Sequence, residues 1–304
     1  HRDLHLIARR QRQMCIRDRG TGITDAEGEI ASSGAGIPSF IGVLDKAVQA
    51  IIKKFSDPSL IKPGDVFATN DPWYGGVTHL NDVVFVMPVF VKNEIIAWTA
   101  NIAHWPDIGG MYPGSLSTDA IEIFQEGLRI PPVKLFEEVI PNETVFRILE
   151  KAVRVPDIVM GDLAAQVAAI HYGEEEFLKI GERYGVENLQ QYTEELLDYT
   201  EELTRAAIRK MPDGSWTFTD YIDDDGFDPG PIVITATVTK KDDEILVDFT
   251  GTSPQCKGAI QPVFATTKAV VYAALKTVLD NDCLLYTSDA ADERSSVDLG
   301  GRRI

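Results

Sequence analysis

The chain has 304 residues, of which 44% are hydrophobic and 25% charged, and its formal net charge is -18 with a pI near 4.7. These values are typical of a soluble globular protein with one or two domains. We expect no nucleic-acid binding, because phosphate contacts need clustered Lys and Arg. We also expect no membrane span, because no apolar run is long enough to cross a bilayer.

The cysteines exclude two further kinds of site. Cys15, Cys256 and Cys283 are scattered and have no CxxC spacing. They therefore predict neither a disulfide framework nor a thiolate zinc site. A reducing cytoplasm is the expected compartment.

The two ends differ from the rest of the chain. Residues 1–19 are strongly basic, and residues 283–304 have no clear pattern. The fragments QRQMCIRD and CLLYTSDAADE resemble translated sequencing-adapter DNA, which recurs at the ends of metagenomic reading frames. We expect both ends to be non-native and the chain to be a truncated fragment. The alternative is a basic targeting arm and a disordered tail.

The segment 20–282 predicts a series of strands and helices. A hairpin is expected in 20–36, followed by a helix over 43–55 that Pro58 and Pro63-Gly64 close. The strands expected next cover 65–69, 82–90 and 94–103. The helices expected after them cover 142–152 and 156–211, with a break at Tyr184-Gly185. The final elements expected are strands over 215–222, 231–239 and 244–250 and a helix over 264–279.

This order of elements predicts the α+β class. We expect mixed or antiparallel sheets with a helical hairpin packed on them. Because strand and helix patterns reach both limits of 20–282, we expect this segment to be an incomplete domain. No internal repeat is present.

Two His-x-x-Asp units flank an apolar segment that reads as two strands. The first contains His79 and Asp82, and the second contains His104 and Asp107. If the two strands fold back on each other, both units come to one end, where two imidazoles and two carboxylates could hold a divalent metal. Imidazole and carboxylate without thiolate favour Mn²⁺, Fe²⁺ or Zn²⁺. The alternative is a structural role for each histidine.

Further residues allow two interpretations each. Asp71 follows a predicted strand and precedes Pro72, so it either caps an Asx turn or acts as a further ligand or an orienting group. The acidic run 223–226 lacks the EF-hand spacing and is expected to be a solvated turn. Asp162 and Gln166 begin a predicted helix and could face a pocket. No phosphate-binding loop, dinucleotide fingerprint or G-x-S-x-G elbow is present.

Residues 20–282 resemble the hydantoinase B/oxoprolinase family. That family includes B-type subunits of N-methylhydantoinases, the C-terminal part of 5-oxoprolinase, and subunits of acetone and acetophenone carboxylases. The segments that carry the resemblance are GDVFATNDPWYGGVTHLNDV (64–83), AHWPDIGG (103–110), PGS (113–115), EIFQEGLRIPPVKL (122–135), GDLAAQVAA (161–169), DDDG (223–226) and VDFTGTSPQCKGAI (247–260).

The resemblance implies ATP-dependent chemistry shared between subunits. A hydantoinase A-type ATPase partner would bind ATP and use it to phosphorylate a carbonyl or enol oxygen. The B-type part would then open a cyclic amide or carboxylate a ketone. We expect a hydrolase acting on cyclic amides, of the N-methylhydantoinase or 5-oxoprolinase type, in a cytoplasmic hetero-oligomer. The alternatives are an acetone- or acetophenone-type ketone carboxylase and a non-catalytic structural subunit.

The resemblance also implies a site. In the acetone carboxylase branch a manganese ion is bound by His and Asp, and the matching residues here are His79, Asp82, His104 and Asp107. We expect Asp71, His79 and His104 to be catalytic. Asp71 is also the substitute metal ligand if Asp82 or Asp107 does not correspond to a ligand of the family. Since the family's B-type chains are much longer, the fragment alone is expected to be inactive.

Overall fold

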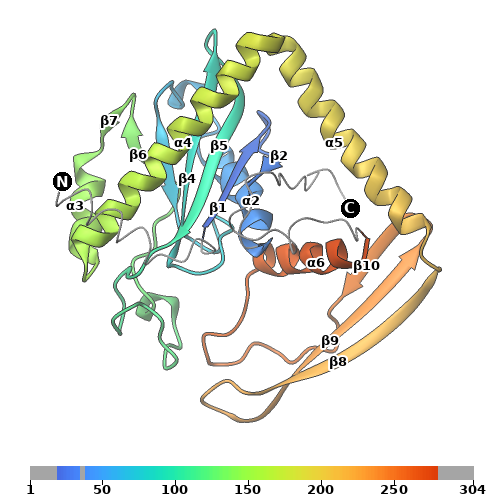
Figure 1. The fold of residues 1–304 in the computed structure, drawn as a ribbon. Helices are drawn as coiled ribbons and strands as arrows, with labels where there is room; N and C mark the ends of the chain where they lie inside the picture. The colour runs from blue at the N-terminus through green and yellow to red at the C-terminus, as the bar shows by residue number, and fades with distance from the viewer. Residues whose placement is uncertain (1–18, 35–37, 280–304) are drawn as a thin grey trace, which may run out of the picture.

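The structure, a computed structural model, describes residues 19–34 and 38–279. Its strands form two antiparallel sheets, and helices cover both faces of the larger one (Figure 1). The larger sheet has the strand order β2-β1-β5-β4-β3-β6-β7. Its strands are β1 (Arg19–Thr24), β2 (Ile30–Ser33), β3 (Val66–Thr69), β4 (Asp82–Val91), β5 (Glu94–His104), β6 (Val133–Glu137) and β7 (Ile140–Pro141). The predicted α+β class is confirmed.

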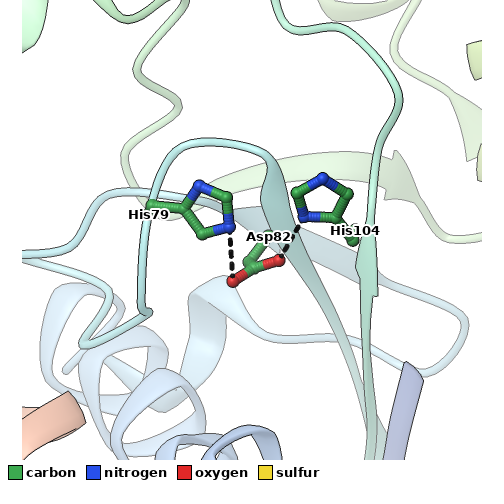
Figure 2. A group of neighbouring side chains, drawn as sticks. All are labelled: His79, Asp82 and His104. Carbon is green, nitrogen blue, oxygen red and sulfur yellow. Dashed lines mark hydrogen bonds and ion pairs between the residues drawn. The ribbon is translucent and has the colours of Figure 1, made fainter. Parts of the chain in front are cut away.

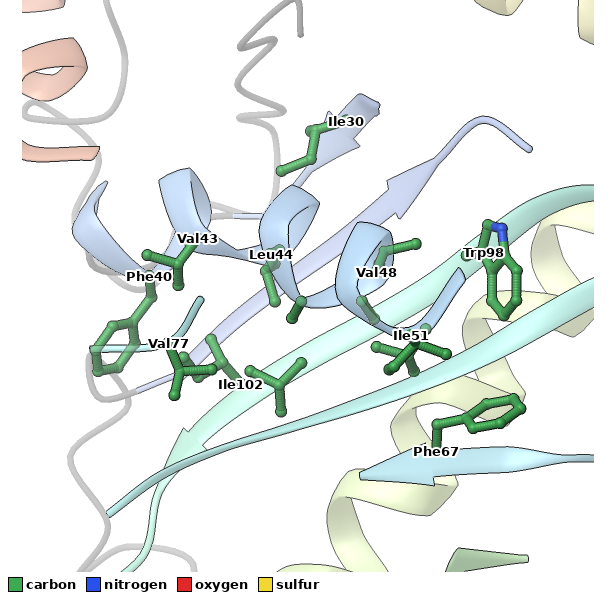
Figure 3. Packing of buried hydrophobic residues seen from close by; sticks show 14 of the residues in the cluster. Ile30, Phe40, Val43, Leu44, Val48, Ile51, Phe67, Val77, Trp98 and Ile102 are labelled. Carbon is green, nitrogen blue, oxygen red and sulfur yellow. The ribbon is translucent and has the colours of Figure 1, made fainter. Parts of the chain in front are cut away.

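Helix α2 (Pro38–Lys54) covers one face of this sheet. Its Leu44, Val48 and Ile51 lie one helical turn apart and pack on alternate residues of β5, including Trp98 and Ile102 (Figure 3). Successive strand residues point to opposite faces, so this layer takes only half of the β5 side chains. The helix begins at Pro38 and not at residue 43, and proline suits the first helical position because its φ is already helical.

Helices α3 (Glu143–Ala152) and α4 (Pro156–Tyr184) cover the opposite face. Leu163 and Ile170 of α4 belong to the same buried cluster as Val83 and Phe85 of β4. Residues 82–89 of β4 are therefore buried on both faces of the sheet. This double burial explains why that stretch of sequence is almost continuously apolar.

Helix α5 (Val186–Arg209) follows α4 after a break at Gly185, where φ is +89°. The predicted break is confirmed. The two helices diverge, however, and α5 runs from the far end of α4 toward the second sheet (Figure 1). Helix α4 lies along the larger sheet, whereas α5 contacts it near its start, where Val186 and Leu189 pack against buried residues of β4 and β5. Leu203, further along α5, is exposed.

The second sheet has the order β10-β9-β8 and consists of β8 (Gly214–Asp224), β9 (Pro229–Lys241) and β10 (Glu244–Asp248). One of its faces carries paired hydroxyls, with Thr217 Oγ1 2.9 Å from Thr237 Oγ1. The chain then forms α6 (Phe264–Leu279), which packs on α2. The 3₁₀ turns η1 (Pro58–Leu60) and η2 (Ile123–Gln125) complete the elements.

The expectations about the two ends fall on residues that the structure does not describe, with one exception. Arg19 belongs to β1, where its backbone is paired with Ala103 of β5. Between residues 19 and 279, leaving out 35–37, no helix combines the length and the apolar character that crossing a bilayer requires.

Candidate metal centre

The β4–β5 hairpin brings the two His-x-x-Asp units to one end of the sheet. Lys92 and Asn93 form its turn with φ values of 50° and 68°, which fixes the register of the two strands. In that register Asp82, the first residue of β4, lies opposite His104, the last residue of β5. His79 reaches the same place through a turn, because the Asp82 N–H donates to the His79 carbonyl at 3.0 Å.

Three of the predicted ligands converge. His79 Nε2 lies 3.1 Å from Asp82 Oδ2, and His104 Nδ1 lies 3.0 Å from Asp82 Oδ1 (Figure 2). The two imidazole centroids are 5.0 Å apart. One ligand atom from each residue can be chosen such that all three lie within 4.8 Å of one another. The Thr78 hydroxyl also donates to Asp82 Oδ2.

The environment keeps Asp82 charged. Burial by itself would raise the pKa of this carboxyl, but the hydrogen bonds and charges of His104 and His79 outweigh burial and lower it. An ionised carboxylate only accepts hydrogen bonds, so both imidazoles donate to it. Asp82 is fully buried, whereas the side chains of His79 and His104 are 35% and 29% exposed. The cluster is therefore open to solvent on its imidazole side.

Two buried asparagines hold the loops around the cluster. The Asn70 amide donates to the carbonyls of Leu80 (2.7 Å) and Leu128 (3.0 Å). The Asn81 amide donates to the carbonyls of Trp105 (2.9 Å) and Gly114 (3.2 Å). These bonds join the turn that carries His79 to the loops that follow β5. Sequence reasoning assigned neither residue a role, although each lies next to a predicted site residue.

The expected fourth ligand, Asp107, lies outside this cluster. Its Oδ2 is 3.0 Å from Arg154 Nη1, and its Oδ1 accepts the backbone N–H groups of Gly109 and Arg154, both at 2.9 Å. Burial would raise the pKa of Asp107, but these bonds and that from Gly114 lower it. Both carboxylate oxygens are thus occupied in fastening the loop 107–114. The structure does not bring Asp107 together with His79, Asp82 and His104, and its role as a ligand remains a prediction.

Asp71 also lies outside the cluster. Its Oδ1 accepts the backbone N–H groups of Trp73 (2.9 Å) and Tyr74 (3.0 Å), and its Oδ2 lies 3.6 Å from Arg129 Nε. Of the two interpretations of this residue, the geometry matches the Asx-turn cap. Its catalytic role remains a prediction.

Glu126 was missed by sequence reasoning. Burial raises the pKa of this carboxyl, and the charge of His79 partly opposes the increase. The neighbouring backbone is fixed by the Leu128 N–H, which donates to the Ile108 carbonyl at 2.8 Å. Glu126 is therefore a further carboxyl group whose pKa depends on the charge of His79. An isolated Glu in a loop gives no pattern that would reveal this position.

The acidic run 223–226 differs from the solvated turn that was expected. Asp225 is buried and its carboxylate accepts four backbone N–H groups, at distances between 2.8 and 3.1 Å. Hydrogen bonds from Asp228, Gly258 and Phe227 hold its pKa well below the ordinary value. The Asp225 oxygens serve to tie the β8–β9 turn to residues 257–258.

The profile of the family described as Hydantoinase B/oxoprolinase matches residues 14–287. A protein of Pseudomonas sp. (strain NS671), provisionally named as the B-type subunit of a D-/L-hydantoinase, is 34% identical over 287 residues, which cover 90% of this chain and 48% of that protein. The acetophenone carboxylase delta subunit of Aromatoleum aromaticum is 27% identical over 240 residues, covering 78% of this chain and 35% of that protein.

The fold has a solved counterpart. The crystal structure of ATP-dependent caprolactamase from Pseudomonas jessenii matches with a TM-score of 0.86 at 31% identity, covering 99% of this chain and 50% of that chain. The chain thus spans about half the length, or less, of these proteins.

Proposed function

Because the chain belongs to the hydantoinase B/oxoprolinase family, we propose that it forms part of the B-type subunit of an ATP-dependent hydrolase that opens cyclic amides. The observation that carries this proposal is the cluster of His79, Asp82 and His104 at the end of the β4–β5 hairpin. It combines a buried charge with two imidazoles that solvent can reach.

The cluster fits a divalent cation. Two imidazole nitrogens and one carboxylate oxygen without thiolate suit Mn²⁺, with Fe²⁺ or Zn²⁺ as further candidates. His79, Asp82 and His104 would hold the ion, and Asp107 would act only through the loop that it fastens. When bound, such an ion supplies Lewis acidity toward a carbonyl oxygen.

The chain's own residues define the rest of the site. Before an ion binds, Asp82 accepts a hydrogen bond from each imidazole and so orients both rings toward its carboxylate. Thr78 supplies a further hydrogen bond to the same carboxylate. Asn70 and Asn81 keep the turn between residues 79 and 82 in place, which holds the rings at the open end of the β4–β5 hairpin.

We assign ATP use to a partner subunit of the hydantoinase A type. The sequence carries no phosphate-binding loop that would bind ATP on this chain. The relatives' names describe subunits, which supports an assembly of unlike chains. In this assignment the partner activates the amide carbonyl, and the His/Asp cluster receives the activated substrate.

Cyclic amides are favoured over ketones by sequence similarity. Identity is 34% to the hydantoinase subunit and 31% to the caprolactamase, but 27% to the acetophenone carboxylase subunit. Hydantoins and caprolactam share a ring amide, and acetophenone does not. Ketone carboxylation is therefore the second candidate, supported by the acetophenone carboxylase match.

Metal binding is tested first, on the protein itself. We expect dialysis against Mn²⁺ followed by elemental analysis to give about one ion per chain, and His104→Ala and Asp82→Asn to lose most of it. His171→Ala is the matched control, because His171 is a part-exposed histidine on α4. Equal Mn²⁺ content in all four proteins would refute the metal site.

Activity is tested on a full-length protein that contains this chain, with and without its ATPase partner. We expect ATP-coupled ring opening of hydantoin, 5-oxoproline or caprolactam only when the two chains are combined. His79→Ala and His104→Ala should lower the rate by orders of magnitude, because loss of a ligand removes much of the metal affinity. Carboxylation of acetone or acetophenone without any amide hydrolysis would support the second candidate instead.

A further inference from the structure

A buried glutamine of α4 is hydrogen-bonded to both strands that carry the cluster. Gln166 Nε2 donates to the Val83 carbonyl at 2.9 Å and to Asn101 Oδ1 at 3.0 Å. Its Oε1 accepts from the indole Nε1 of Trp105 at 2.7 Å. Both amide N–H groups and the amide oxygen therefore have partners. The Asn101 side-chain amide in turn donates to the main-chain carbonyl of Gln166 at 2.7 Å, so Asn101 and Gln166 are joined by two hydrogen bonds.

Two of the three partners of the Gln166 side chain are direct neighbours of cluster residues. Val83 follows Asp82 on β4, and Trp105 follows His104 at the end of β5. One amide group thus connects the neighbours of Asp82 and His104, whose side chains are 3.0 Å apart and are drawn in Figure 2. The Gln166 side chain has no hydrogen bond to a cluster residue itself, so its influence on the cluster passes through Val83 and Trp105 and through Asn101 of β5.

We propose that Gln166 is a positioning residue that sets the placement of His104 relative to Asp82, and through it the affinity and coordination of the divalent ion. The proposal rests on the proposed function, since it concerns the same cluster. An amide is the side chain this position needs, because it donates to β4 and accepts from Trp105 at once. Outer residues that orient ligands in this way commonly change metal affinity by about 10–100-fold when they are replaced.

A purely structural role is the competing explanation. Gln166 is buried at the α4–sheet interface, so its loss would lower stability even if the cluster did not respond. Thr99 provides the matched control. Its hydroxyl donates to the Ile170 carbonyl at 3.1 Å, which is also a buried bond between β5 and α4. Thr99 lies away from the end of β5 that carries His104.

The variants separate these roles. Gln166→Met keeps the size of the side chain but removes all three bonds. Trp105→Phe keeps an aromatic ring and removes, of the three side-chain bonds of Gln166, only the one from the Trp105 indole. This variant replaces Gln166→Met in the experiment if Gln166→Met does not fold. Thr99→Val removes a bond of the same interface and leaves the Gln166 network intact.

The experiment measures Mn²⁺ affinity by titration and the Mn²⁺ electron paramagnetic resonance spectrum in the three variants and the unchanged protein. We expect Gln166→Met to weaken binding by about 10–100-fold and to alter the spectrum, and Trp105→Phe to do so to a smaller extent. Thr99→Val should lower the melting temperature without changing either. Unchanged affinity and spectrum in Gln166→Met, or the same change in Thr99→Val, would overturn the proposal.

A second readout needs no metal. The imidazole ¹⁵N shifts of His104 in the metal-free protein report its hydrogen bond to Asp82, and Gln166→Met should move them while Thr99→Val does not. Failure of the unchanged protein to bind Mn²⁺ would count against the proposed function alone. Unmoved His104 shifts in Gln166→Met would count against the positioning role alone.

Discussion

The two aspartates of the His-x-x-Asp units have different roles, although their sequence context is the same. Asp82 is the first residue of a strand whose neighbours are buried, and its carboxylate is bonded to two imidazoles and a hydroxyl. Asp107 lies in a glycine-rich loop, where backbone N–H groups and Arg154 take up both oxygens. The two carboxylates therefore differ in what surrounds them and not in their spacing from a histidine: Asp82 is hydrogen-bonded to the two imidazoles, whereas Asp107 is hydrogen-bonded to the loop and to Arg154.

Asp107→Asn tests this division. We expect the free energy of unfolding to fall by about 1–3 kcal/mol, because the amide leaves N–H donors of the loop without an acceptor. The Mn²⁺ content should stay close to that of the unchanged protein, whereas Asp82→Asn should lose it. Urea unfolding and elemental analysis of the two variants give the answer. Loss of metal in Asp107→Asn with little loss of stability would restore Asp107 as a ligand.

Asp225 makes stability depend on acid pH. Four backbone N–H groups hold its pKa below the ordinary value of 3.8. The unfolded chain takes up a proton near the ordinary value and the folded chain only at lower pH. The stabilisation from Asp225 is therefore complete above that value and is lost as pH falls toward the folded pKa.

Asp225→Asn should accordingly lower the urea midpoint at about pH 7, and the difference from the unchanged protein should shrink at about pH 3. Asp224→Asn is the control, since it removes the same charge from an exposed neighbour whose carboxylate accepts the Gly226 N–H. A difference of constant size at both pH values would show that the charge of Asp225 does not contribute.

Helices α2 and α6 approach each other closely at a glycine. A Cβ atom on Gly42 would lie 2.5 Å from Ala269 Cβ and 2.9 Å from Ala269 Cα, so Gly42→Ala should lower the free energy of unfolding by about 1–3 kcal/mol. A Cβ atom on Gly161 of α4 would meet nothing within 4 Å. Gly161→Ala should raise stability by about 0.5–1 kcal/mol through helix propensity. Thermal unfolding of both variants tests the packing, and equal shifts in one direction would contradict it.

Sequence patterns predicted most elements but not their partners. The break at Gly185 and the helix that begins after Asn142 followed from local chemistry, and Asn142 does cap α3 through the Val145 N–H. The apolar spacing of α5 does not say what covers it, so its divergence from the sheet could not be predicted. In the site, Asp82 and Asp107 each lie three residues after a histidine, so the sequence could not distinguish their surroundings. Asp107 is paired with Arg154, which is distant in sequence.

The whole molecule combines high net charge with an exposed sheet. The formal charge of -18 opposes association of copies, and salt screens that repulsion. Strand β8 lies at the edge of its sheet and is largely exposed along its length. Trp216, Phe218 and Ile222 lie on the face opposite the paired hydroxyls. A long exposed edge of this kind is a template for pairing with another strand.

We therefore expect association that grows with salt and with protein concentration and runs through β8. Phe218→Lys should reduce it in sedimentation velocity runs while leaving the melting temperature unchanged, because Phe218 is 72% exposed. The added lysine lowers the net negative charge, so a general charge effect would act in the opposite direction. Thr219→Lys places the same charge on the hydroxyl face of β8. If the apolar face contributes to association in addition to the strand edge, Thr219→Lys should reduce association less than Phe218→Lys does. A protein that stays monomeric in high salt at every concentration would contradict the expected pairing through β8.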